Sequence, residues 1–225
     1  LAMRGEWRGP VGRALPAGGF APVLADPGAR RLLLVALANA TPVAVTSTLF
    51  LFFVESRLEA PGYEGPLLLL FFLAAAAAAP GWGVAADRFG ARRVLLFAMS
   101  LSVLGFLFAL GLGAGDWPAF AVICVVTGAA LGADMVVLPA LFARRLAVVA
   151  PGAAEGFGLW SFVSKATLAI AAAVLLPTLE AAGFRAGTEN DETALRTLTV
   201  LYAGVPCGLK LLAMALLATA RLNEE

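Results

Sequence analysis

Residues 67–79 read LLLLFFLAAAAAA, an apolar run without one polar side chain. A strand of a membrane barrel would alternate apolar and polar residues, and this run does not. Lipid-exposed backbone must satisfy its own hydrogen bonds, so an open membrane segment of this kind is helical. The run therefore predicts a helix that crosses a lipid bilayer.

The composition of the chain agrees with this prediction. Hydrophobic residues make up 61% and charged residues 14% of the sequence, and the mean hydropathy is +0.90. Soluble domains carry about 45–50% apolar and about 25% charged residues. The sequence has no histidine, which excludes histidine metal sites and the common histidine general base. The isolated Cys124 and Cys207 are expected to be small buried residues.

Apolar segments long enough to cross the bilayer, which needs about 20 helical residues, recur along the chain. They predict an all-α polytopic membrane protein with six transmembrane helices. The expected spans are 32–54, 66–86, 94–112, 117–143, 157–179 and 195–218.

The distribution of arginine predicts the orientation in the membrane. Basic residues collect in cytoplasmic loops, and here most arginines fall on the side of the bilayer that also holds both chain ends. We expect a multi-pass protein of the cell membrane with a cytoplasmic linker at 1–29, a bundle at 30–220 and a cytoplasmic tail at 221–225. The arginines on this side are Arg4, Arg8, Arg13, Arg30, Arg31, Arg88, Arg92, Arg93, Arg144, Arg145 and Arg221.

Gly128 and Gly132 form a G-x-x-x-G pair within one predicted span. Small residues at this spacing let helices approach closely. The pair is compatible with packing inside the chain or with a contact between copies.

Three ionisable residues, Asp134, Lys165 and Lys210, lie near the middle of predicted spans. A charge at the bilayer centre costs at least about 2.5–3.5 kcal/mol and usually faces a pathway or a partner. At about 1.5 Å per residue, all three lie roughly 15–17 Å from the cytoplasmic face, and Asn39 lies slightly shallower. We expect these residues to line a polar cavity near the midplane, with Trp160 available to stack against a sugar ring.

Asp134 and Lys165 lie on consecutive spans at equal depth, so we expect them to form an ion pair. Lys210 then lacks an acidic partner within the chain. Its partner would be an acid of a missing segment, a substrate group or a carbonyl. The alternative interpretation is that Asp134 and Lys165 form a purely structural pair.

The loop after the second predicted span carries the motif G-x-x-x-D-R-x-G-x-R-R. A glycine turn with opposed charges at the membrane surface is suited to a conformational latch. The alternative is a positive-inside anchor. The residues are Gly83, Asp87, Arg88, Gly90, Arg92 and Arg93.

This loop resembles the cytoplasmic motif of the major facilitator superfamily. Residues 128–141 and 156–165 are similar to the tenth and eleventh helices of the glycoside–pentoside–hexuronide:cation symporters, the melibiose permease family. The resemblance implies the C-terminal half of a twelve-helix secondary active transporter with alternating access. It implies a sugar or glycoside substrate, a role in coupling or substrate binding for Lys165, and a missing N-terminal half. That half would hold the site for a coupling Na⁺ or H⁺. Arg144 and Arg145 stand where the family usually has an acidic stretch.

Two other functions stay open. The spans hold few hydroxyl and amide groups, so the substrate could be a lipid or another amphiphile. A non-transporting six-helix scaffold or assembly subunit could use the G-x-x-x-G face. An enzyme is not expected, because H-E-x-x-H and G-x-S-x-G motifs are absent from the sequence. We expect no cofactor, metal site or nucleic-acid partner.

Overall fold

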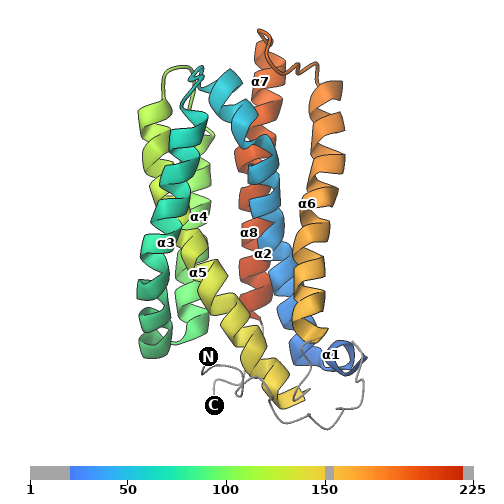
Figure 1. Cartoon of the computed structure of the whole chain (residues 1–225). Coiled ribbons are helices and arrows are strands. Elements are labelled where there is room, and N and C mark those ends of the chain that lie inside the picture. Colours follow the sequence, from blue (N-terminus) through green and yellow to red (C-terminus); the bar gives the residue numbers. More distant parts are fainter. Residues whose placement is uncertain (1–20, 150–154, 220–225) are drawn as a thin grey trace, which may run out of the picture.

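The computed structural model describes residues 21–149 and 155–219 (Figure 1). This part of the chain is helical and contains no strand, which confirms the all-α prediction. The division into linker, bundle and tail stays a prediction, since residues 1–20 and the tail lie outside the described residues. The elements are α1 (Ala21–Ala25), α2 (Pro27–Phe52), η1 (Phe53–Arg57), α3 (Glu64–Phe89), α4 (Ala91–Ala109), α5 (Trp117–Val149), α6 (Glu155–Ala181), α7 (Glu192–Thr199), η2 (Val200–Gly204) and α8 (Val205–Ala218).

Six of the described helical segments are long and apolar enough to cross a membrane, and each overlaps one predicted span. Two of them are composite, because the π-helical turns η1 and η2 continue α2 and join α7 to α8. The Asp26 carboxylate caps α2 by accepting a hydrogen bond from the Ala29 amide at 2.6 Å, and Pro27 opens the helix. Asp191 caps α7 in the same way, through the Ala194 amide at 2.8 Å. Both starts use a residue that satisfies a free amide at a helix N-terminus.

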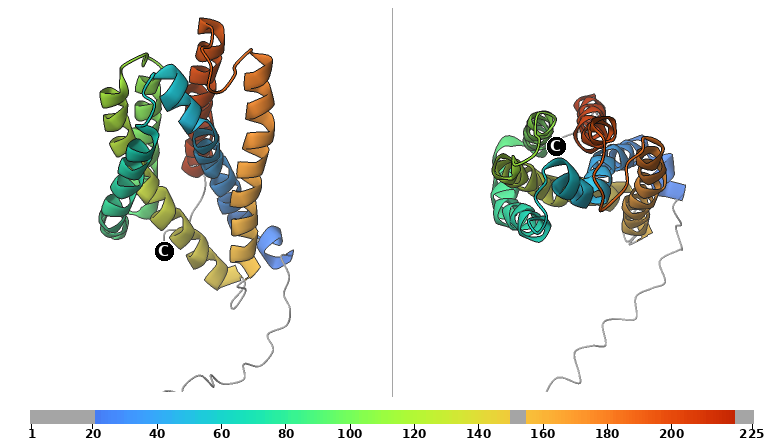
Figure 2. Two further views of the ribbon diagram at one scale, coloured as in Figure 1. Left: turned by 45° about the horizontal axis from the view of Figure 1, so that its top comes forward. Right: turned by 90° about the horizontal axis from the view of Figure 1, so that it is seen from above.

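The helices form two groups. Helices α3, α4 and α5 pack on one another, and α2 packs against α6 and α8. Helix α5 is tilted, so that it runs from the first group at one end to a position beneath the second group at the other (Figure 1). The views in Figure 2 show the same separation, with the two groups side by side when seen along the bundle.

The closest helix contact joins α3 and α5 at the predicted glycine pair. A Cβ atom added to Gly128 would lie 2.3 Å from the Phe71 carbonyl oxygen, and one added to Gly132 would lie 2.6 Å from the Ala75 oxygen. Real Cβ atoms do not approach backbone that closely, so only glycine fits at either position. Helix α3 therefore covers the G-x-x-x-G face within the chain. That face is not available to a second copy or to a partner, although the scaffold interpretation requires it to be.

The half of the bundle far from the α3–α4 turn holds an aromatic core. The rings of Phe53 in η1 and Tyr202 in η2 stack with centroids 4.2 Å apart, and Phe120 of α5 packs against both. Cys124 and Cys207 are buried free thiols, as the sequence predicted.

We predict that Gly128→Ala lowers the melting temperature of the purified chain in nanodiscs. Overpacking of this kind costs about 1–3 kcal/mol, because the α3 backbone has to move away. Gly158→Ala in α6 is the matched control, since no heavy atom lies within 4 Å of its added Cβ. Equal melting temperatures for the two variants would contradict the α3–α5 contact.

Candidate functional site: a buried ion pair beside a cavity

A buried ion pair joins α5 to α8. The Lys210 ammonium donates to Asp134 Oδ2 at 2.5 Å, and the two side chains are only 3% and 7% exposed. Lys210 also donates to Asn39 Oδ1 of α2 at 2.6 Å. Three helices therefore place one cation and two oxygen acceptors at a single point inside the bundle.

The predicted pair of Asp134 with Lys165 is wrong, and so is the prediction that Lys210 lacks an acidic partner in the chain. Lys165 is exposed on α6 and forms no ion pair with any residue that the structure describes. The reason lies in helix packing: α6 packs mainly on α2, whereas α8 packs on α2 and α4 and so brings Lys210 beside α5. Helices α5 and α6 follow each other in sequence but do not pack closely on one another.

The pair is mutually compensating. Each charge alone would carry a large desolvation cost in an apolar bundle, and the partner offsets part of it. Asp134 lies two residues after Gly132, where α5 is held tightly against α3. The carboxylate is thus attached to a part of the bundle that has little freedom to relax around an unpaired charge.

A cavity of about 370 Å³ lies against this pair, between α2, α5 and α6. Asn39, Asp134 and Trp160, all predicted as site residues, lie on its wall. Lys210 contacts the wall residues Asn39 and Asp134 without lining this cavity itself, and Lys165 does not line it. The structure therefore brings together four of the five predicted substrate or coupling residues and leaves Lys165 apart.

Two hydroxyl residues of this wall, Ser47 and Ser164, were missed by the sequence analysis. Their spacing from predicted site residues could have pointed to them, because Ser47 follows Asn39 by eight residues and Ser164 follows Trp160 by four. Residues at these spacings share a helix face.

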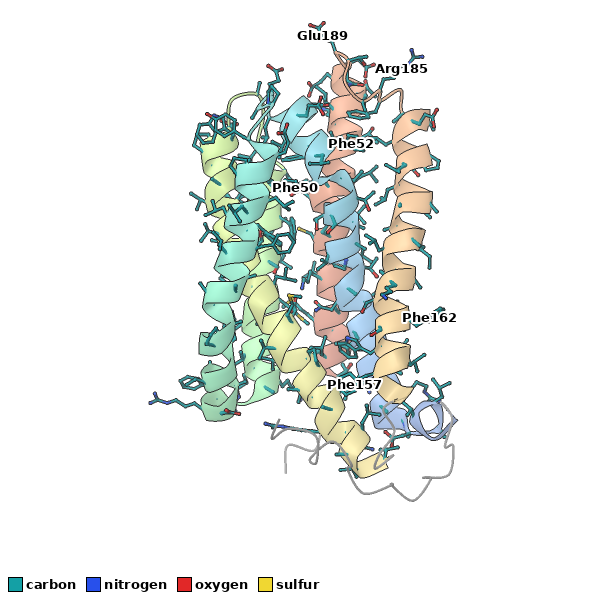
Figure 3. All side chains as sticks on the ribbon, viewed as in Figure 1. Phe50, Phe52, Phe157, Phe162, Arg185 and Glu189 are labelled. Carbon is teal, nitrogen blue, oxygen red and sulfur yellow. The ribbon has the colours of Figure 1, made fainter. Side chains whose placement is uncertain are left out.

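A second cavity, of about 290 Å³, adjoins the first and is mainly apolar. The two share Val43, Ser47 and Leu131 on their walls. The second wall is rich in rings, and Figure 3 labels one of them, Phe50, on α2; the others are Phe71, Phe72, Phe106, Phe120 and Tyr202. The sequence did not predict this second cavity, because its aromatic residues come from five separate elements.

The predicted latch residues lie at the end of the bundle where α3 turns into α4. Gly90 has a φ of 89°, a left-handed value that favours glycine, and it ends one helix and begins the next. Asp87 lies 3.7 Å from the Arg144 guanidinium of α5, and Arg88 lies over the Phe89 ring. Arg92 donates to the Ala218 carbonyl at the end of α8. Gly83 lies within α3, and Arg93 forms no ion pair within the described residues.

Arg145, the neighbour of Arg144, makes the stronger contact. Its guanidinium donates to both carboxylate oxygens of Asp26, at 2.9 and 2.7 Å. These hydrogen bonds lower the pKa of Asp26, which also caps α2. The two arginines that replace the acidic stretch of the resembled family thus connect α5 to α3 and to the start of α2.

We predict that Asp134→Asn destabilises the chain by about 3–5 kcal/mol, because it leaves the Lys210 ammonium buried without a counter-charge. The double variant Asp134→Asn/Lys210→Met should unfold at a higher temperature than Asp134→Asn. Arg185→Met, which removes an exposed arginine in the α6–α7 connection, is the control and should change stability by no more than about 0.5 kcal/mol. Thermal unfolding in nanodiscs measures all three, and additive effects of the two site substitutions would refute the pairing.

One comparison with known proteins bears on this arrangement. The family model described as MFS/sugar transport protein matches residues 15–224, nearly the whole chain. The search of curated proteins found no match. Six membrane-spanning helices, a glycine-turn motif between the second and third of them, and a cavity among the helices all fit this family. The chain therefore belongs to the MFS/sugar transport protein family and is a membrane transporter of the major facilitator superfamily.

Proposed function

We propose that this transporter is the C-terminal six-helix half of a secondary carrier, and that it contributes half of a binding site for a sugar or glycoside. The observation that carries the proposal is the cavity of about 370 Å³ bounded by α2, α5 and α6. Secondary carriers place their substrate sites near the bilayer midplane, between moving helix groups.

The polar part of the cavity wall matches a polyhydroxylated ligand. Asn39 offers its amide nitrogen as a donor, because its oxygen accepts from Lys210, and Ser164 offers an acceptor oxygen, because its proton is donated to the Trp160 carbonyl. The Ser47 hydroxyl can both donate and accept. The Trp160 ring is half-buried on the same wall and offers an apolar face for a pyranose ring. Asn39 and Ser47 lie on α2, and Trp160 and Ser164 lie on α6. A ligand bound between them would therefore contact both helices.

The exposed surface supports a second helical half. Only 11% of the α3 span and 17% of the α6 span are buried, against 61% for α5. Lys165 is exposed on α6, in the middle of an apolar span. A lysine facing lipid at that depth is costly, and an N-terminal six-helix half that covers this face would remove the cost. Lys165 would then contact the substrate or the coupling ion at the junction of the halves.

Alternating access supplies a role for the contacts at the α3–α4 end. The pairs Asp87–Arg144 and Asp26–Arg145 hold α5 against α3 and α2 in this conformation. Their separation would let α5 tilt and open the cavity on that side, which we assign to the cytoplasm. The coupling Na⁺ or H⁺ would bind in the N-terminal half, as the family resemblance implies.

A second candidate substrate is a lipid or another amphiphile. The aromatic cavity of about 290 Å³ adjoins the polar one, so a ligand with a polar head and an apolar tail would occupy both. A bare sugar would use only the first.

Uptake into cells that express the full-length gene product tests these assignments. We predict that Ser47→Leu, which places a bulky side chain on the wall of both cavities, reduces uptake of a labelled glycoside at least tenfold. Thr41→Leu is the matched control on the same helix, because Thr41 lines neither cavity.

Competition by a free sugar and by its octyl glycoside distinguishes the two substrate classes. Absence of uptake for both classes, with normal membrane insertion, would contradict both proposed substrate classes. Unchanged uptake by Lys165→Ala would remove Lys165 from the mechanism.

A further inference from the structure

The surroundings of the Lys210 ammonium resemble those of a bound cation. Its two contacts are oxygen atoms, Asp134 Oδ2 at 2.5 Å and Asn39 Oδ1 at 2.6 Å. A lysine ammonium is a compact point charge, so it can occupy the position that a small cation would take among oxygen ligands. Because Lys210 is part of α8, its ammonium is a cation that is covalently tethered to the protein.

The set of oxygen atoms is larger than Lys210 uses. Asp134 Oδ1 is buried and has no hydrogen-bond donor among the described residues. Buried acceptors are normally satisfied, so this atom needs a further donor or cation. A small cavity of about 20 Å³ lies at the same place, lined in part by Asp134 and Lys210. A space of this size holds one water molecule or one small ion.

Three hydroxyl residues, Thr46, Ser102 and Thr127, line the small cavity. Thr127 Oγ1 donates its proton to the Ile123 carbonyl at 2.7 Å, and Thr46 Oγ1 donates to the Pro42 and Val43 carbonyls at 3.1 Å. With those protons engaged in backbone hydrogen bonds, both oxygens can only accept. Ser102 is buried on the same wall, and its hydroxyl is free to turn its oxygen inward.

We propose that this half of the carrier contains a cation site of Na⁺ type, which Lys210 occupies with its ammonium. At the position of the ammonium the ligands are the carboxylate of Asp134 and the amide oxygen of Asn39. The hydroxyl residues Ser102, Thr127 and Thr46 line the small cavity beside it, which Asp134 shares, and would supply further oxygen ligands. While Lys210 is in place, its charge excludes Na⁺. When the ammonium is removed or withdrawn, Asp134 recruits Na⁺ from solution.

The charge balance of the bundle supports one cation and no more. Asp134 and Lys210 are the only buried ionisable carboxylate and amine in the described ranges 21–149 and 155–219. One carboxylate in an apolar surrounding balances one monovalent cation, and a second cation would be left without a counter-charge. Lys210 and Na⁺ therefore compete for the same carboxylate. This inference concerns the six-helix chain itself and does not depend on the transported substrate.

Thermal unfolding of the purified chain in nanodiscs tests the proposal, with NaCl, KCl and choline chloride compared at equal ionic strength. The wild-type chain should melt at the same temperature in all three salts. Lys210→Ala should melt lower in choline chloride, and about 300 mM NaCl should raise its melting temperature by about 3 °C or more, because Na⁺ binds only the folded state. Ethylammonium chloride, which supplies the missing ammonium, should also stabilise this variant.

Two controls separate site binding from general salt effects. Asp134→Asn/Lys210→Ala lacks the carboxylate and should not respond to Na⁺. Arg185→Ala removes an exposed cation in the α6–α7 connection, outside the apolar spans, and should behave as the wild type does. A specific Na⁺ stabilisation of the wild-type chain would overturn the proposal, as would a folded Lys210→Ala chain that ignores Na⁺. Failure of Lys210→Ala to fold at any NaCl concentration, while the double variant folds, would also overturn it, since the vacated site was not refilled.

Discussion

An apolar bundle gives each buried charge and each backbone amide no solvent to bind, so every one of them needs a partner inside the protein. Helices satisfy the backbone. For the side chains, the need for a partner falls mainly on Asp134 and Lys210, two residues that lie 76 positions apart in the sequence. Their contact fixes how α8 lies relative to α5, and the Asn39 amide adds α2 to the same point. The arrangement of the three central helices depends on this contact.

The glycine contact between α3 and α5 works with the ion pair. Gly128 and Gly132 bring α5 against the α3 backbone, six and two residues before Asp134. The carboxylate is then presented from a helix that is held by a backbone contact and that also borders the two cavities. Close packing and open space thus adjoin each other along one helix. This contrast is what a carrier needs, since a rigid support allows a ligand to act on the movable helices that face it.

The two ends of the bundle are held by different means. Ion pairs and an arginine–carbonyl contact join the helices at the α3–α4 end, where Asp26, Asp87, Arg92, Arg144 and Arg145 meet. At the other end, Arg57 donates to the Leu112 carbonyl and contacts Glu192, and the stacked rings of Phe53 and Tyr202 lie beneath. Arg185 and Glu189 lie in the α6–α7 connection above them (Figure 3). The Asp87–Arg144 pair is exposed, and such pairs are weak and can separate, whereas a buried aromatic core resists opening. The difference favours movement at the α3–α4 end.

The sequence by itself determined the membrane class, the helical architecture and the six spans, because these follow from the length and hydropathy of local segments. It also singled out Asp134, Lys210 and Asn39 as candidate site residues, because a polar residue inside an apolar span is visible without any knowledge of packing. The partner of Asp134 was decided only by the tertiary structure. Equal depth made Lys165 and Lys210 equivalent along the bundle axis, and nothing local in the sequence shows which helix lies beside which. The same reason explains the aromatic cavity and the use of Gly128 and Gly132 inside the chain: both depend on contacts between helices far apart in sequence, which only the packed bundle specifies.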